Sequence, residues 1–165
     1  MVETAAEVVT RRQHRQHQTG SRQTLNLVVV DASVVLKWFV PEIHTEAASR
    51  LLSSSHHFMS PDLLFAEVGN AIWKKVRRGE LTTDDANRLA LDISTVAVET
   101  VPSKDLLIDG CALALTTGVT VYDGLYLALA VRMNAELITA DDKLRRMVDA
   151  HPMTRAHVRL VQDIQ

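Results

Sequence analysis

The chain has 165 residues, is 47% hydrophobic and carries a formal net charge of −2 at pH 7, which suits one globular domain with its own core and leaves little room for a second. Its single cysteine, Cys111, excludes a disulfide framework and a cysteine-based zinc site. Apolar runs such as LYLALAV are far shorter than the ~20 residues that cross a bilayer, and no apolar signal core follows Met1. We therefore expect a soluble, cytoplasmic protein with no membrane association.

Residues 1–24 differ in composition from the rest of the chain. The stretch RRQHRQHQTGSRQT is polar, has no hydrophobic period and ends in turn formers. Four arginines against two glutamates make residues 1–24 basic, whereas the remainder is net acidic. We expect residues 1–24 to be a disordered N-terminal extension, with a basic RNA-contacting arm as an alternative, and residues 25–165 to form the folded domain.

Short apolar runs then alternate with amphipathic stretches. LNLVVV (25–30) is predicted to be a buried strand, followed by helices over 32–39 and 42–53 and a brief strand at 57–60. Ser60 and Pro61 suit the cap and first position of a helix over 62–78. The next helix, over 81–98, should be capped by Thr83 ahead of two aspartates.

The second half continues the alternation. The predicted elements are a strand at 98–102, a helix over 103–117, a helix that begins at Asp123 and runs to 134, a strand at 136–140, a helix over 141–150 and a strand at 158–161. Strands that alternate with helices indicate a mostly parallel sheet with helices on both faces. The predicted fold class is therefore α/β, a three-layer α/β/α sandwich.

Acidic residues occupy the positions where such a sheet binds its ligands, which are the carboxyl ends of the strands. Asp31 and Asp141 follow predicted strands, and Asp123 starts a predicted helix after the apolar run VTVY. Each of these aspartates also suits a helix N-cap, which is the simpler interpretation of any one alone. Glu67 differs because it lies inside a helix at the margin of the apolar face, where a carboxylate is costly unless it is metal-bound or paired, for instance with Lys74.

Carboxylates that converge on one crevice repel one another, and a divalent cation relieves that repulsion. Oxygen ligands without cysteine or a well-placed histidine suit Mg²⁺ or Mn²⁺ rather than zinc. A site of this kind supports metal-assisted phosphoryl transfer or phosphodiester hydrolysis.

Four motifs occur in order along the chain: VVVDASVVLKWF, LLFAEVGNAIWK, VYDGLYLALAVRMN and ITADDKL. Together they resemble a PIN domain over about residues 27–163, and the length and layout are similar to the VapC toxins of type II toxin–antitoxin systems. The resemblance implies a PIN-like fold and a metal-dependent endoribonuclease that hydrolyses RNA to leave a 5′-phosphate and a 3′-hydroxyl. It also implies a VapB-like antitoxin as partner and a homodimer.

The resemblance assigns roles residue by residue. The acids implied to hold one or two Mg²⁺ or Mn²⁺ ions and to act in catalysis are Asp31, Glu67, Asp123 and Asp141. The residues implied to support them are Ser33, Asn70, Thr139 and, as a neighbour of the last acid, Asp142.

RNA also requires positive charge beside an acidic centre. The cations that we expect to contact RNA are Lys74, Lys37 and Arg145, with Lys74 first because it shares a helix stripe with Glu67. Trp38 and Trp73 could stack on bases, although packing is the simpler interpretation. Tyr122 and Tyr126 are expected to pack their helix against the sheet.

Three other functions are alternatives to a metal-dependent endoribonuclease. A phosphatase of the haloacid dehalogenase type needs a second aspartate two residues after the first, where this chain has Ser33. A non-catalytic PIN-like binding module would be expected to have lost an acid, and all four are present. A PIN nuclease of RNA processing, outside any toxin–antitoxin pair, fits the same residues.

Overall fold

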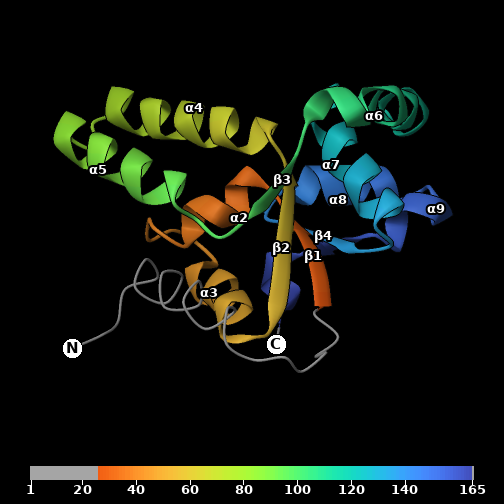
Figure 1. Ribbon diagram of the computed structural model, residues 1–165, viewed down its shortest axis with the longest axis horizontal. Helices are drawn as coiled ribbons and strands as arrows, with labels where there is room; N and C mark the ends of the chain where they lie inside the picture. The colour runs from red at the N-terminus through yellow and green to blue at the C-terminus, as the bar shows by residue number, and fades with distance from the viewer. Residues whose placement is uncertain (1–25, 165) are drawn as a thin grey trace.

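The computed structural model describes residues 26–164 and has a five-stranded sheet at its centre (Figure 1). The strands are β1 (Asn26–Val30), β2 (His56–Pro61), β3 (Glu99–Val101), β4 (Glu136–Thr139) and β5 (Val158–Leu160). Their order is β3-β2-β1-β4-β5, and every neighbouring pair is parallel, which confirms the predicted parallel sheet. The extension predicted at residues 1–24 lies outside the described residues.

Helices connect the strands. They are α2 (Ala32–Lys37), α3 (Thr45–Ser53), α4 (Leu63–Arg77), α5 (Thr83–Ser94), α6 (Ser103–Thr117), α7 (Val121–Arg132), α8 (Asp142–Asp149) and α9 (Pro152–Arg155), with a short 3-10 turn η1 (Val161–Asp163) after β5. The sequence pattern did not predict α9, whose four residues are too few to show a helical hydrophobic period.

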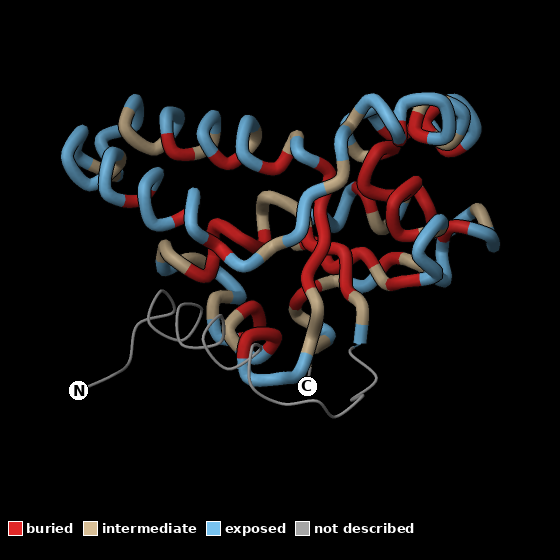
Figure 2. The backbone as a smooth tube through the Cα atoms, viewed as in Figure 1, coloured by how far each residue is buried: buried red, intermediate tan, exposed pale blue. Residues whose placement is uncertain are grey.

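Alternate residues of β1 belong to two separate hydrophobic cores. Val28 and Val30 pack with the inner faces of α2, α3, α4 and α5, whereas Val29 packs with α6, α7 and α8. This division follows from the two-residue period of a strand. Figure 1 shows the two groups of helices on opposite sides of the sheet, and Figure 2 shows buried chain along the central strands and most of α7. The predicted three-layer α/β/α architecture is therefore confirmed.

Two predicted helix starts were wrong. β2 runs through Ser60 and Pro61, which pair with β3, so that neither residue begins the following helix. Instead, α4 begins at Leu63. In α5 the cap is Thr82 rather than Thr83, because Thr82 accepts a hydrogen bond from the Asp85 amide at 3.1 Å in a reciprocal capping box. This helix also ends at Ser94, four residues before its predicted end.

Two glycines allow α6 and α7 to cross at close range. A Cβ atom on Gly124 would lie far inside van der Waals contact with the backbone carbonyl of Gly110, which cannot move without displacing α6. We expect Gly124→Ala to lower the free energy of unfolding by about 1–3 kcal/mol, the usual cost of overpacking. Chemical denaturation would measure the loss.

Gly69 provides the matched control for this prediction. It is a helical glycine on α4, and an added Cβ would meet no atom within 4 Å. Gly69→Ala should therefore stabilise the protein slightly, by about 0.5–1 kcal/mol, because alanine loses less backbone entropy in a helix. Equal effects of the two substitutions would contradict the close-packing argument.

Among the described residues, no single helix is long and apolar enough to cross a membrane. By length and composition alone, α6 and α7 together could, with a bend of 112° between them.

Candidate active site

The site lies where the chain reverses its direction across the sheet. From β1 the chain adds β2 and β3 on one side, and β4 and β5 later form on the other. Parallel sheets bind ligands at such a switch point, outside the carboxyl ends of the strands. Asp31 follows β1 there, and its amide donates a hydrogen bond to the carbonyl of Ile138 on β4 at 3.3 Å.

Asp31 caps α2 and belongs to the site as well. Its Oδ1 accepts hydrogen bonds from the Val34 amide at 3.1 Å and from the Ser33 hydroxyl at 2.6 Å. Ser33 Oγ in turn accepts from the Ala140 amide at 3.0 Å, so this hydroxyl joins the ends of β1 and β4. Burial raises the pKa of Asp31, and hydrogen bonds from Ser33 and Thr139 partly oppose that rise. Asp31 is therefore a helix cap, as its position predicted, and this role does not prevent its carboxylate from acting in a site as well.

Asp141 has the same arrangement after β4. Its Oδ1 caps α8 by accepting from the amides of Lys143 at 2.7 Å and Leu144 at 3.1 Å. The fully buried Thr139 accepts from the Asp141 amide at 3.0 Å and also hydrogen-bonds Asp31, which places it between the two acids. Asp142 is exposed and accepts from the side chain of Gln162 at 3.1 Å.

Asp123 is the third residue of its helix, whereas the sequence indicated that it is the first. The helix α7 begins at Val121, and Thr120 is its cap. The Asp123 carboxylate accepts from the Thr120 hydroxyl at 2.7 Å, and the Asp123 amide donates to that hydroxyl oxygen at 3.1 Å. The expectation that Asp123 starts the helix was wrong, because the last two residues of the apolar run, Val121 and Tyr122, are already helical.

Glu67 is fixed by a tyrosine from the opposite layer. The hydroxyl of Tyr126, whose side chain is buried, donates to Glu67 Oε2 at 2.6 Å. Burial raises the pKa of Glu67, as do the charges of Asp31 and Asp123, whereas the Tyr126 hydrogen bond lowers it. The acids at the end of β1 and on α7 therefore lie near enough to Glu67 of α4 to act on it electrostatically. Within the described chain, no ion pair joins Glu67 to Lys74, which is exposed.

Tyr126 contacts a predicted site acid, a contact that the sequence interpretation missed. Its packing role was predicted, and it is 3% exposed, but Tyr122 is 60% exposed and does not pack as expected. The sequence did contain a sign that Tyr126 lies near the acids. It follows Asp123 by three residues, so the two side chains share one face of the helix. Buried tyrosine hydroxyls also need a polar partner.

The donor chemistry of the four acids fits a hard divalent cation. They supply carboxylate oxygens, and among residues 26–164 none of the four forms an ion pair with lysine, arginine or histidine. Burial is the main cause of the raised pKa of Glu67, and the negative charges of Asp31 and Asp123 add to it. In the part of the chain that is described, however, no three histidine, cysteine or acidic side chains lie close enough together to form a ligand cluster.

Two of the three cations predicted to contact RNA have structural partners instead. Lys37 is buried and pairs with Glu42 at 2.8 Å. Arg145 donates to the carbonyls of Arg155 and Val158, both at 2.9 Å, and so attaches α8 to the chain around β5. Sequence position could not reveal these partners, which come from other elements. Only Lys74 is exposed as expected.

Asn70 and the two tryptophans complete the predicted set. Asn70 is exposed on α4, one turn after Glu67. Trp38 packs in the core and donates from Nε1 to the carbonyl of Ala48 at 2.9 Å, which confirms the packing interpretation for that ring. Trp73 remains 57% exposed.

The fold and the arrangement of the acids define the class of protein. The chain belongs to the PIN domain family, whose model matches residues 28–150. It is similar to Ribonuclease VapC3 from Pyrobaculum aerophilum, with 39% identity over 119 residues that cover 71% of this chain and 91% of the relative. Ribonuclease VapC1 from Mycobacterium tuberculosis is 33% identical over 117 residues, which cover 70% of this chain and 86% of that protein.

A solved toxin–antitoxin complex from Klebsiella pneumoniae contains a similar chain. The two superpose with a TM-score of 0.58 at 16% identity, over 81% of this chain and 97% of the other. At this identity the likeness concerns the fold alone.

Proposed function

We propose that this protein is a metal-dependent endoribonuclease of the VapC type, acting on RNA in the cytoplasm. The observation that carries the proposal is that the charges of Asp31 and Asp123, which come from two other elements, act on Glu67 at the switch point of the sheet. Membership of the PIN family and the similarity to two proteins named as VapC ribonucleases support the same activity.

The residues that would hold Mg²⁺ or Mn²⁺ are Asp31, Glu67, Asp123 and Asp141. When bound, the ion supplies a water activated for in-line attack on the phosphodiester and stabilises the charge of the transition state. The chain itself fixes the ligands. Ser33 and Thr139 orient Asp31, the capping box orients Asp123, and Tyr126 holds Glu67. Asn70 and Lys74 extend the polar surface along α4 next to Glu67.

A VapB-like antitoxin and a second copy of the chain are the partners that we propose. Support for the antitoxin comes from the relatives named VapC and from the fold shared with a toxin–antitoxin complex. An antitoxin that placed a basic side chain among the acids would supply the compensating charge that the described residues do not provide.

The test of the activity is incubation of the purified protein with total cellular RNA in Mg²⁺, in Mn²⁺ and in EDTA, followed by mapping of 5′-phosphate ends. We expect discrete new ends with either metal and none in EDTA. Cleavage that persists in EDTA would contradict the metal-dependent mechanism. No cleavage by folded, antitoxin-free protein in any condition would favour a non-catalytic binding module.

A further inference from the structure

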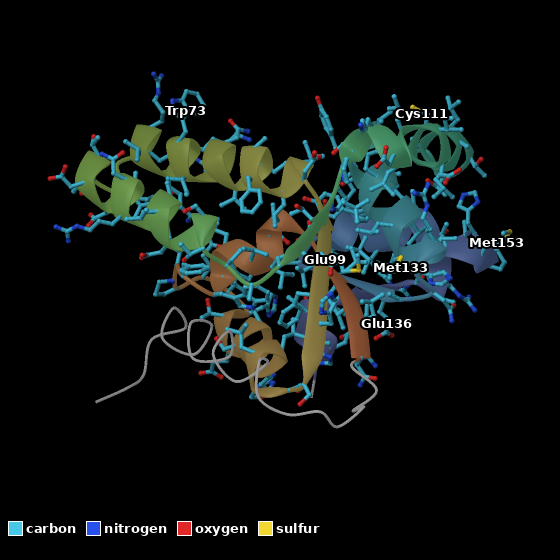
Figure 3. All side chains as sticks on the ribbon, in the orientation of Figure 1. Trp73, Glu99, Cys111, Met133, Glu136 and Met153 are labelled. Carbon is cyan, nitrogen blue, oxygen red and sulfur yellow. The ribbon has the colours of Figure 1, made fainter. Side chains whose placement is uncertain are left out.

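The outer face of α4 is defined here as Asn70, Trp73, Lys74, Arg77 and the C-cap residue Arg78. All five residues are exposed. Figure 3 shows Trp73 on the outer side of α4, pointing away from α5 and the sheet. A tryptophan with 57% of its surface in water forfeits much of the stabilisation that burial would give. Such a side chain therefore suggests a partner that covers the ring.

The ring is already associated with a cation. The guanidinium of Arg77 lies 5.6 Å from the centre of the Trp73 ring, one helical turn away, in a cation–π contact. This contact limits the freedom of both side chains while much of the ring remains exposed. An aromatic ring beside an arginine is the combination that binds the bases of single-stranded nucleic acids.

The charge of the outer face of α4 suits a phosphate backbone. Lys74, Arg77 and Arg78 are its ionisable residues, and Glu67 is the only acid within α4. Of the three cations, Arg78 has an acidic neighbour, Glu80, at 3.7 Å. The neighbouring helix α5 begins with Asp84 and Asp85, so the positive charge is specific to α4 and does not extend over the whole helical pair.

The outer face of α4 is also continuous with the candidate active site. Lys74 and Glu67 lie two turns apart on one stripe of the helix. At 1.5 Å and 100° per residue, Trp73 stands about 9 Å further along the helix axis than Glu67 and about 120° around it. An RNA strand cleaved beside Glu67 would therefore reach the Trp73 ring by curving around α4, past Lys74 and Asn70, which lie between the two positions on the helix surface.

We propose that the outer face of α4 holds single-stranded RNA substrate, with one base stacked on Trp73 and neighbouring phosphates beside Lys74 and Arg78. The inference rests on the proposed ribonuclease function and specifies which RNA this site takes. A duplex hides the faces of its bases, so a stacking ring selects unpaired segments such as loops. Stacking tolerates any base, so sequence preference must come from other contacts.

A protein partner is the competing occupant of this surface, since exposed aromatic rings also mark protein interfaces. The cluster of cations around the ring favours RNA, and the experiment separates the two possibilities.

The chain contains two tryptophans, of which only Trp73 is exposed among the described residues, so its fluorescence reports directly on this surface. A single-stranded oligoribonucleotide would be titrated into the full-length Asp31→Asn variant in EDTA, where no cleavage occurs. We expect quenching that saturates with the RNA and is absent when Trp73→Phe is added. Trp73→Ala should weaken binding at least about tenfold, the usual effect of losing one stacked base.

Met153→Ala is the matched control, because Met153 is an 81% exposed apolar residue at the other end of the molecule (Figure 3). It should leave RNA affinity unchanged. RNA affinity that is equal with and without the Trp73 ring would overturn the stacking inference while leaving the ribonuclease proposal intact, and would assign the ring to a protein partner. Equal quenching by duplex RNA would overturn it too. Absence of RNA binding by every variant would contradict the ribonuclease proposal itself.

Discussion

Asp31→Asn is expected to lower the rate of RNA cleavage by at least about 100-fold while the protein remains folded. The loss follows from removal of one of the charges that would hold the metal ion, and its size is that of losing a group that stabilises transition-state charge. Initial rates of cleavage of a defined oligoribonucleotide, at saturating Mn²⁺, would measure it. Rates equal to those of the wild type would show that the metal site is assigned wrongly.

The fold should tolerate this substitution because asparagine retains the capping function. The Asp31 side chain accepts from the Val34 amide, and an asparagine carbonyl can accept the same bond. Asp31→Ala is the informative comparison, since it removes both the charge and the cap and should destabilise the protein by about 1 kcal/mol relative to Asp31→Asn. Two variants that are equally inactive but differ in stability would separate the two roles of this residue.

Stability in metal-free buffer should depend on pH in a way that identifies Asp31. Because its pKa is raised on folding, the folded protein binds a proton more tightly than the unfolded chain does. The free energy of unfolding therefore falls as the pH rises from the ordinary carboxyl range through the raised pKa, and this loss is complete above it. Asp31→Asn should remove that part of the dependence and melt at a higher temperature than the wild type at neutral pH in EDTA.

Tyr126→Phe should weaken Mn²⁺ binding by about tenfold or more, the usual effect of removing a residue that orients a metal ligand. The substitution keeps the buried ring but removes the hydroxyl that holds Glu67 Oε2 at 2.6 Å. We expect cleavage to require a higher Mn²⁺ concentration and to recover largely at saturation. Mn²⁺ binding followed by electron paramagnetic resonance would measure the affinity independently of activity.

Tyr122→Phe is the control for this variant, because it removes the same atom from an exposed tyrosine on the same helix. Its Mn²⁺ affinity should equal that of the wild type. If Tyr126→Phe bound Mn²⁺ as tightly as the control, the hydrogen bond to Glu67 would be a feature of packing alone.

The features that could be predicted from sequence are those that depend on local patterns. Apolar strands alternating with amphipathic helices indicated the parallel sheet, and its topology placed Asp31 and Asp141 at the same edge because each comes within two residues of the end of one of two adjacent strands. Helix starts were less predictable, since Thr82 and Thr83 are equally good caps and only the backbone geometry selects between them. The burial of Ser60 and Pro61 in β2 depends on pairing with β3, which is distant in the sequence.

Contacts between layers could not be predicted for a related reason. Lys37 was expected to face RNA, but Glu42 turns back towards it and Lys75 of α4 joins the same carboxylate group at 2.5 Å. The partner of Glu67 likewise comes from α7, 59 residues later in the chain. Sequence motifs were enough to predict the four acids. Their supporting contacts depend on how the layers pack and could not be predicted.

The hydrogen bond between Tyr126 and Glu67 links helices that belong to different hydrophobic cores. Glu67 lies on α4, which packs into one core, and Tyr126 lies on α7, which packs into the other. The acids therefore keep their spacing only while both cores hold their positions across the sheet. We therefore expect a substitution deep in either core that shifts one helix, such as Gly124→Ala, to lower activity by separating these carboxylates, although all four acids remain in the sequence.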